Sequence, residues 1–143
     1  EVAHHVGGTY VCIEGPAFST RAESQLYRSW GGTVIGMTNL QEAKLAREAE
    51  MCFATIALAT DYDCWHEAEA EVTVEGILAV MARNIENSRR LLSAVVADID
   101  PTRPCTCQDA LQDALLTPVG SISAEVKADL APILGRYLPE ASD

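Results

Sequence analysis

A short apolar run at residues 51–60 constrains the fold of this chain more than any other feature of its sequence. A run of this length, rich in Ile, Leu, Phe and Ala, is typical of a strand buried on both faces. It ends in Asp61-Tyr62-Asp63, whose i, i+2 spacing places both carboxylates on one face if the strand continues. Because ligands of open α/β sheets bind beyond the carboxyl ends of strands, these acids form either a turn cap or part of a site.

Strand and helix patterns alternate along the first hundred residues. Two short apolar strands are predicted at residues 9–13 and 33–37, in addition to the run at 51–60. Capping patterns and apolar periodicity predict helices over residues 24–30, 40–49 and 73–96. Since alternating strands and helices build βαβ units, we expect an α/β fold with a mixed, partly parallel central sheet flanked by helices.

The pattern changes after residue 100, where several prolines interrupt the chain. Two shorter helices are predicted near residues 108–116 and 123–134. The length of 143 residues fits one domain. We therefore expect a single domain with a core at residues 8–100 and a C-terminal helical extension at 101–143.

The charge and hydropathy of the chain argue against nucleic acid and membranes as binding partners. The net charge is −11, with only ten basic residues, which argues against nucleic acid because phosphate backbones require clustered Lys and Arg. A phosphate ion would have to be held by backbone N–H groups, hydroxyls and helix dipoles. No apolar run reaches the roughly 18 residues of a membrane span. The first residues also lack a signal-peptide pattern, so we expect a cytoplasmic protein without a membrane partner.

Five cysteines are an odd number and make a poor secreted framework. Cys12 and Cys52 lie in apolar runs and are expected to be small buried hydrophobic residues. Cys105 and Cys107 form either a thiol pair or a strained disulfide, and a reducing cytosol favours the thiols. No further Cys or His follows this pair at a zinc-binding spacing, so we predict no metal site.

Two helix N-termini are candidate positions for ligand binding. At residues 35–39 a buried strand runs into a helix N-terminus, whose N–H groups and dipole attract an anion beside the Thr38 hydroxyl. Alternatively, Thr38 and Asn39 simply cap the helix. Gly36 allows close approach of a ligand or marks a bulge. Phe18, at the other entrance, is either a core anchor or an aromatic platform for a planar ligand.

Three sequence blocks occur in order at spacings typical of one family: EGPAFSTRAES at residues 14–24, IGMT at 35–38 and ATDYDCW at 59–65. Together they resemble the C-terminal half of the S-methyl-5′-thioadenosine phosphorylases, in the trimeric branch of the purine nucleoside phosphorylases. The likeness extends over residues 8–96 and more weakly through 105–111. It implies a nucleoside phosphorylase fold, of which this chain is the C-terminal half, and a homotrimer or a dimer of trimers.

The resemblance implies phosphorolysis of methylthioadenosine to adenine and 5-methylthioribose 1-phosphate, with inorganic phosphate as co-substrate and no cofactor. Cleavage of the glycosidic bond leaves negative charge on the purine, so a carboxyl group that donates a proton toward N7 lowers the barrier. Two nearby carboxylates raise one another's pKa, which helps one stay protonated. We assign Asp61 this role, while Asp63 orients it or contacts the adenine amino group.

The resemblance also implies the other site residues. It assigns the phosphate contact to Thr38 and ties four side chains to substrate preference, although the last three of them also fit the apolar face of a helix: Ser19, Val74, Ile77 and Leu78. A Cys-x-Cys sequence is familiar in bacterial and archaeal relatives, which favours a disulfide between Cys105 and Cys107. The substrate-binding positions implied by the likeness are Phe18, Ile35, Gly36, Met37, Thr60, Asp61 and Asp63.

Family chains are about twice as long, and their N-terminal half carries a Gly-rich phosphate turn and an Arg-His pair that this sequence lacks. We therefore expect a complementary N-terminal half on another chain. Without it, an unpaired sheet edge and an exposed core predict association and an inactive protein. The alternatives are a non-catalytic fragment or interaction module of this fold, and a phosphorylase that prefers inosine, guanosine or methylthioinosine. Asp61 argues against the second, because inosine-type enzymes tend to carry Asn there.

Overall fold

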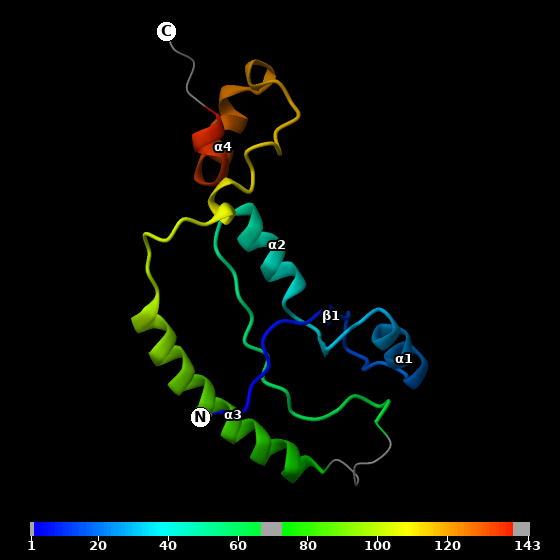
Figure 1. The fold of residues 1–143 in the computed structure, drawn as a ribbon. Coiled ribbons are helices and arrows are strands. Elements are labelled where there is room, and N and C mark those ends of the chain that lie inside the picture. The colour runs from blue at the N-terminus through cyan, green and yellow to red at the C-terminus, as the bar shows by residue number, and fades with distance from the viewer. Residues whose placement is uncertain (1, 67–72, 139–143) are drawn as a thin grey trace. The chain divides into compact units, whose positions relative to one another are not determined.

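Two stretches of the chain, residues 2–66 and 73–138, are described by the computed structural model (Figure 1). They belong to two units, each built from segments far apart in the sequence. None of the helices in these stretches is both long and apolar enough to cross a bilayer. The first unit comprises Glu1–Leu40 and Thr55–Thr102, and the second comprises Gln41–Ala54 and Arg103–Asp143.

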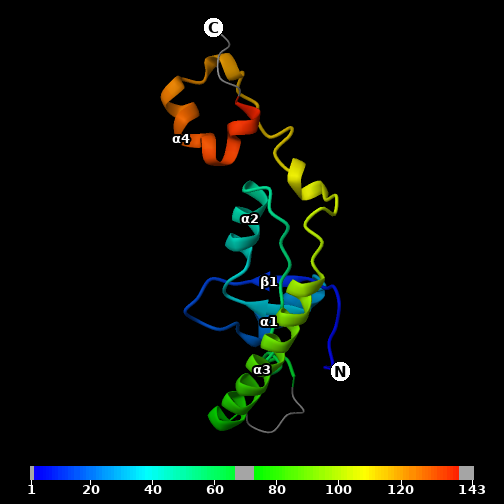
Figure 2. The ribbon, with the colours of Figure 1, turned by 90° about the vertical axis from the view of Figure 1, so that its left-hand side faces the viewer.

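A parallel pair of short strands lies in the first unit. β1 (Tyr10–Cys12) pairs with β2 (Val34–Gly36), and Val11 lies opposite Ile35. α1 (Arg21–Ser29) connects the two strands and lies beside them in both views (Figures 1 and 2). This β-α-β arrangement confirms both strand predictions and the parallel pairing, and with them the α/β class.

The N-terminus of α1 carries the predicted capping box. The Thr20 hydroxyl accepts a hydrogen bond from the Glu23 backbone N–H at 3.3 Å, and the Glu23 carboxylate accepts one from the Thr20 N–H at 2.7 Å. The Thr20 hydroxyl also donates to the same carboxylate oxygen at 2.8 Å. The bonds that the Thr20 N–H and hydroxyl donate, the backbone one first, lower the pKa of Glu23. The reciprocal pair satisfies two backbone donors that the helix itself cannot.

Replacing Thr20 with Ala is expected to destabilise α1 by about 0.5–2 kcal/mol, because the N-cap acceptor is lost. The pKa of Glu23 should rise toward its usual value. A carboxyl whose pKa is lowered by folding stabilises the native state above its unfolded pKa and loses that contribution as the pH falls. The pH dependence of α1 stability below pH 5 should therefore be weaker in the variant. Amide hydrogen exchange of α1 measures both effects, and unchanged protection of α1 would contradict them.

Two further helices begin at their predicted residues. α2 (Leu40–Glu48) follows Asn39, whose φ of 110° is unlike the extended backbone of an N-cap. The Asn39 Oδ1 accepts a hydrogen bond from the Thr55 hydroxyl at 2.7 Å, so this side chain ties the helix entrance to the apolar run. α3 (Val74–Asp98) is capped by Thr73, whose hydroxyl accepts from the Gly76 N–H at 3.1 Å.

The apolar run at residues 51–60 does not form the predicted buried strand. These residues have no regular secondary structure, and Phe53, Ile56 and Leu58 are 43%, 43% and 44% exposed. A strand buried on both faces requires backbone partners at its edges and layers above and below, which the described residues do not supply. Leu138 is the one large apolar side chain that is buried in the described stretches. The predicted exposure of the core is therefore confirmed.

The second unit confirms one C-terminal helix and corrects the other. α4 (Ala124–Leu134) matches the helix predicted near residues 123–134, and the Ser123 hydroxyl caps it by accepting from the Val126 N–H. Instead of a helix at residues 108–116, the chain forms the 3₁₀ helix η1 (Thr106–Asp109) followed by turns. The Leu111 N–H donates to the Glu50 carboxylate at 3.0 Å rather than to the carbonyl four residues earlier. Two more 3₁₀ helices flank α4: η2 (Val119–Ser121) precedes it and η3 (Gly135–Tyr137) follows it.

Candidate active site

Asp61 and Asp63 lie in a short loop rather than at the end of a strand. The Thr60 hydroxyl donates to Asp61 Oδ1 at 2.9 Å, and the Cys64 backbone N–H donates to Asp63 Oδ1 at 2.9 Å. Asp61 is exposed, whereas Asp63 and Thr60 are half-buried. The acids therefore act as turn acceptors here, and Asp61 remains open to solvent.

This loop meets the first sequence block. The Cys64 thiol donates to the Ser19 carbonyl at 3.5 Å, a contact between residues 45 positions apart. The Arg28 guanidinium of α1 lies over the Trp65 ring, with its carbon 3.4 Å from the ring centroid. A cation this close to an indole face is a favourable contact. Two of the three sequence blocks, at residues 14–24 and 59–65, are thus joined in one unit.

Three aromatic side chains of the acidic loop and the residues just after it pack on one another, an arrangement that the sequence did not predict. Tyr62 and His66 stack with ring centroids 4.4 Å apart, and Trp65 contacts both rings edge-on. α3 reaches the same region, because the Asn84 side chain donates to the Ala59 carbonyl at 2.8 Å. The closely spaced Tyr, Trp and His residues after Asp61 are the sequence feature from which these ring contacts could have been predicted. No local pattern marks Asn84, which lies 25 residues from its partner.

The second block, at residues 35–38, is held by β1 and by the first block. Ile35 and Gly36 lie in β2 and are half-buried, as is Met37. A side chain on Gly36 would meet the Tyr10 hydroxyl at 2.0 Å, so packing already accounts for a glycine there. A side chain on Gly15 would meet Met37 Sδ at 2.8 Å. Close packing therefore brings the IGMT segment against the turn that precedes Phe18.

The position proposed for phosphate lies at the exit of β2. Thr38 is exposed, and its carbonyl accepts a hydrogen bond from the Cys12 thiol at 3.6 Å. α2 begins two residues later along the chain, at Leu40. A helix N-terminus with a neighbouring hydroxyl suits an anion.

The remaining predicted positions differ in exposure. Phe18 is 86% exposed, so it is not the core anchor that was the alternative to an aromatic platform. Val74 and Leu78, in the first turns of α3, are 68% and 58% exposed, whereas Ile77 is half-buried. The hydroxyl oxygen of Ser19 is shielded from solvent and has no hydrogen-bond partner among the described residues.

Cys105 and Cys107 are thiols, and the disulfide that the resemblance favoured between them is absent. Their sulfurs instead form a group with Cys52, which is exposed rather than buried. The Cys107 backbone N–H and the neighbouring thiols lower the pKa of Cys105 to about 7. Hydrogen bonding to Cys105 raises the pKa of Cys52 to about 11. Cys105 therefore ionises before Cys52.

The sequence pattern of the Phosphorylase superfamily matches residues 1–97, and the chain belongs to this superfamily. The chain is similar to S-methyl-5′-thioadenosine phosphorylases from Geobacter sulfurreducens (54% identical) and Gloeobacter violaceus (56% identical). These alignments cover 94% and 96% of this chain but only 47% and 46% of the relatives. The chain therefore spans about half the length of the curated relatives it matches.

Solved structures agree with the sequence comparison. The fold is similar to a methylthioadenosine phosphorylase from an antarctic soil metagenomic library, with a TM-score of 0.80 and 48% identity over 89% of this chain and 45% of that one. It is also similar to a double mutant of adenosine/methylthioadenosine phosphorylase from Schistosoma mansoni in complex with adenine. That match has a TM-score of 0.62 and 35% identity, and it covers 76% of this chain and 39% of the other.

Proposed function

We propose that this chain supplies the purine-binding half of a methylthioadenosine phosphorylase site. The observation that carries the proposal is the contact between Cys64 and Ser19, which joins the acidic loop to the Phe18-Ser19 segment across 45 residues. Sequence identity of 54% to a phosphorylase of this specificity supports the assignment of substrate. The reaction is attack of inorganic phosphate on the sugar with adenine as the leaving group.

Asp61 is the residue proposed to face the departing purine. Its carboxyl group is open to solvent and hydrogen-bonded to Thr60, so it is free to approach a bound base. A proton donated toward N7 neutralises the charge that develops on the leaving group. Asp63 accepts from the Cys64 N–H, and this bond fixes the loop from which Asp61 projects. Phe18 supplies an exposed ring that is suited to stack on the base.

Thr38 is the proposed phosphate contact of this half. One hydroxyl at a helix entrance is too little to hold a phosphate ion in a chain with a net charge of −11. We therefore propose that residues corresponding to the N-terminal half of the relatives complete the phosphate site. The Ser19 Oγ atom is shielded from solvent and has no hydrogen-bond partner among the described residues. We propose that the completed site supplies a partner for it.

Assembly, location and cofactor use follow from the same proposal. We propose a homotrimer or dimer of trimers in the cytoplasm, acting with phosphate alone and without a cofactor. Size-exclusion chromatography with light scattering would report the assembly, and a monomer as the active species would contradict it. An adenine-specific enzyme is favoured over an inosine-type one because a carboxyl oxygen of Asp61 can accept from a 6-amino group, whereas an Asn NH₂ would donate to a 6-oxo group.

The test is a phosphate-dependent adenine-release assay on methylthioadenosine. We would compare the 143-residue chain alone with the completed enzyme, meaning this chain joined to the N-terminal half of the Geobacter sulfurreducens relative. Adenine release is expected only from the completed enzyme and only with phosphate present. Release by the isolated chain would refute the need for a second half. A completed enzyme that cleaves inosine faster than methylthioadenosine would refute the substrate assignment.

A further inference from the structure

Three cysteine sulfurs gather in the second unit, outside the residues assigned to phosphorolysis. The sulfur atoms of Cys52, Cys105 and Cys107 all lie within 4.8 Å of one another. Cys52 comes from the apolar run, whereas Cys105 precedes η1 and Cys107 lies within it. The sequence alone did not predict this group, because 53 residues separate Cys52 from Cys105.

From this geometry we propose a binding site for one thiophilic metal ion, with Zn²⁺ as the ion that fits best. Zinc–thiolate bonds are about 2.3 Å long, so three tetrahedral sulfur ligands lie about 3.8 Å apart. The observed group would need to contract by about 1 Å or less to reach that spacing. Three thiolates leave a fourth position, which water fills in such sites. Soft sulfur ligands select Zn²⁺ or Cu⁺ over Mg²⁺ and Ca²⁺.

The group is accessible to an ion from solution. Cys52 is exposed, and Cys105 and Cys107 are half-buried. The segment that precedes η1 also lines an open surface hollow, formed by Pro104, Cys105, Thr106, Gln108 and Asp109. An ion can therefore reach the thiols without any opening of the unit.

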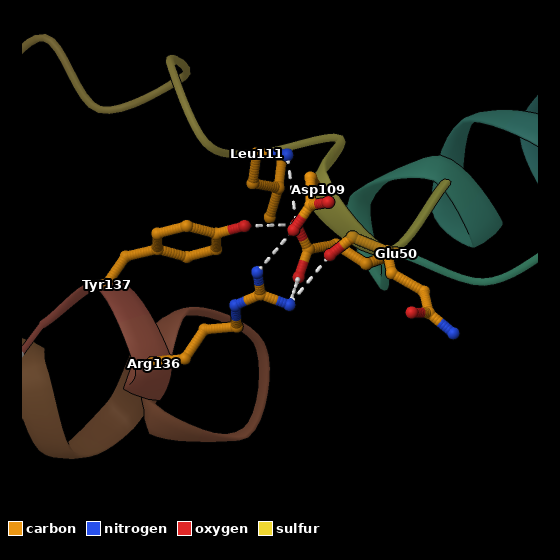
Figure 3. Close-up of polar contacts among 6 residues, drawn as sticks. Glu50, Asp109, Leu111, Arg136 and Tyr137 are labelled. Carbon is orange, nitrogen blue, oxygen red and sulfur yellow. Dashed lines mark hydrogen bonds and ion pairs between the residues drawn. The ribbon is translucent and has the colours of Figure 1, made fainter. Parts of the chain in front are cut away.

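A polar network holds the two cysteine-bearing segments in place. Glu50, two residues before Cys52, accepts hydrogen bonds from the Leu111 N–H and the Tyr137 hydroxyl and forms an ion pair with Arg136 at 3.3 Å (Figure 3). The Tyr137 bond is the main reason that the pKa of Glu50 is lowered. With most of its side chain shielded, at 10% exposed, the carboxylate is well placed as an anchor.

Arg136 completes the network on the side of η1. Its guanidinium donates to Asp109 Oδ1 at 2.7 Å (Figure 3). It also donates to the Gln108 carbonyl at 2.7 Å. Glu50 and η1 are therefore tied to the same side chain. Such outer contacts position metal ligands, and their loss typically lowers metal affinity by about 10–100-fold. Glu50 and Arg136 are thus positioning residues for the proposed site.

The test uses the full, reduced chain and Zn²⁺ as the probe. Isothermal titration is expected to give one ion per chain, and Cys52→Ser, Cys105→Ser and Cys107→Ser should each lower the affinity more than 100-fold. Cys64→Ser is the matched control, since Cys64 is exposed and lies in the other unit. Glu50→Gln should lower the affinity by about 10–100-fold while leaving the stoichiometry at one.

A second measurement on the unmodified chain covers the case in which a variant fails to fold. Bound Zn²⁺ should protect Cys52, Cys105 and Cys107 from alkylation, as mapped by mass spectrometry, while Cys64 reacts at its metal-free rate. Unchanged affinity in Cys52→Ser would show that the Cys105–Cys107 pair binds alone and would overturn the proposal. Equal alkylation of all four cysteines with and without Zn²⁺ would also overturn it. Neither result depends on phosphorolysis.

Discussion

Replacing Asp61 with Asn in the completed enzyme is expected to lower kcat/KM for methylthioadenosine by about 10²–10⁴-fold. The amide keeps the shape of the carboxyl group but cannot transfer a proton to the purine. Because the Thr60 hydroxyl can still donate to the amide oxygen, the loop should keep its conformation. The loss should appear mainly in kcat, since the proton transfer is made in the transition state.

Asp98→Asn is the matched control for this variant. Asp98 is an exposed acid at the end of α3, so its replacement changes the net charge equally but should leave turnover unchanged. The measurement is steady-state adenine release, repeated with inosine as the competing substrate. The ratio of methylthioadenosine to inosine turnover should fall, because an Asn side chain can pair with a 6-oxo purine. Full activity of Asp61→Asn on methylthioadenosine would refute the proton-donor role.

A charge placed in the apolar run is expected to have opposite consequences in the two forms of the protein. In the isolated chain Ile56 is 43% exposed, so Ile56→Asp should change stability little and should reduce association. In the completed enzyme we expect residues 51–60 to be a strand buried on both faces. An unpaired carboxylate there should cost several kcal/mol and lower the melting temperature by roughly 10 °C.

Leu116→Asp provides the comparison, because Leu116 is 92% exposed in the second unit. It should shift the melting temperature of the completed enzyme far less than Ile56→Asp does. Differential scanning calorimetry gives both values, and light scattering gives the state of association of the isolated chain. Equal shifts for the two variants would mean that the run stays exposed in the completed enzyme, contrary to the strand prediction.

Local patterns predicted the elements that depend on local contacts. The capping box of Thr20 and Glu23 set the start of α1, and the hydroxyls of Thr73 and Ser123 did the same for α3 and α4. Each of these caps is a hydrogen bond across three residues, so the sequence contains both partners. The parallel strand pair was also predictable, since a capped helix between two apolar strands forms a β-α-β unit.

Contacts between distant residues decided the features that were missed. Residues 108–116 form turns instead of the predicted helix. The Leu111 N–H donates to the carboxylate of Glu50, 61 residues away, rather than to a helical carbonyl. Phe53 and Ile56 have the composition of a buried strand but remain exposed, because burial depends on partner strands rather than on composition.

The three sequence blocks by themselves determined the family and nominated Asp61, Asp63 and Thr38, because residue type and spacing carry that information along the chain. Only the tertiary structure decided that the acids sit in a loop joined to Ser19 through Cys64. It alone brought Cys52 to Cys105 and Cys107. Packing and hydrogen bonds across more than forty residues set both arrangements, and no local pattern specifies such contacts.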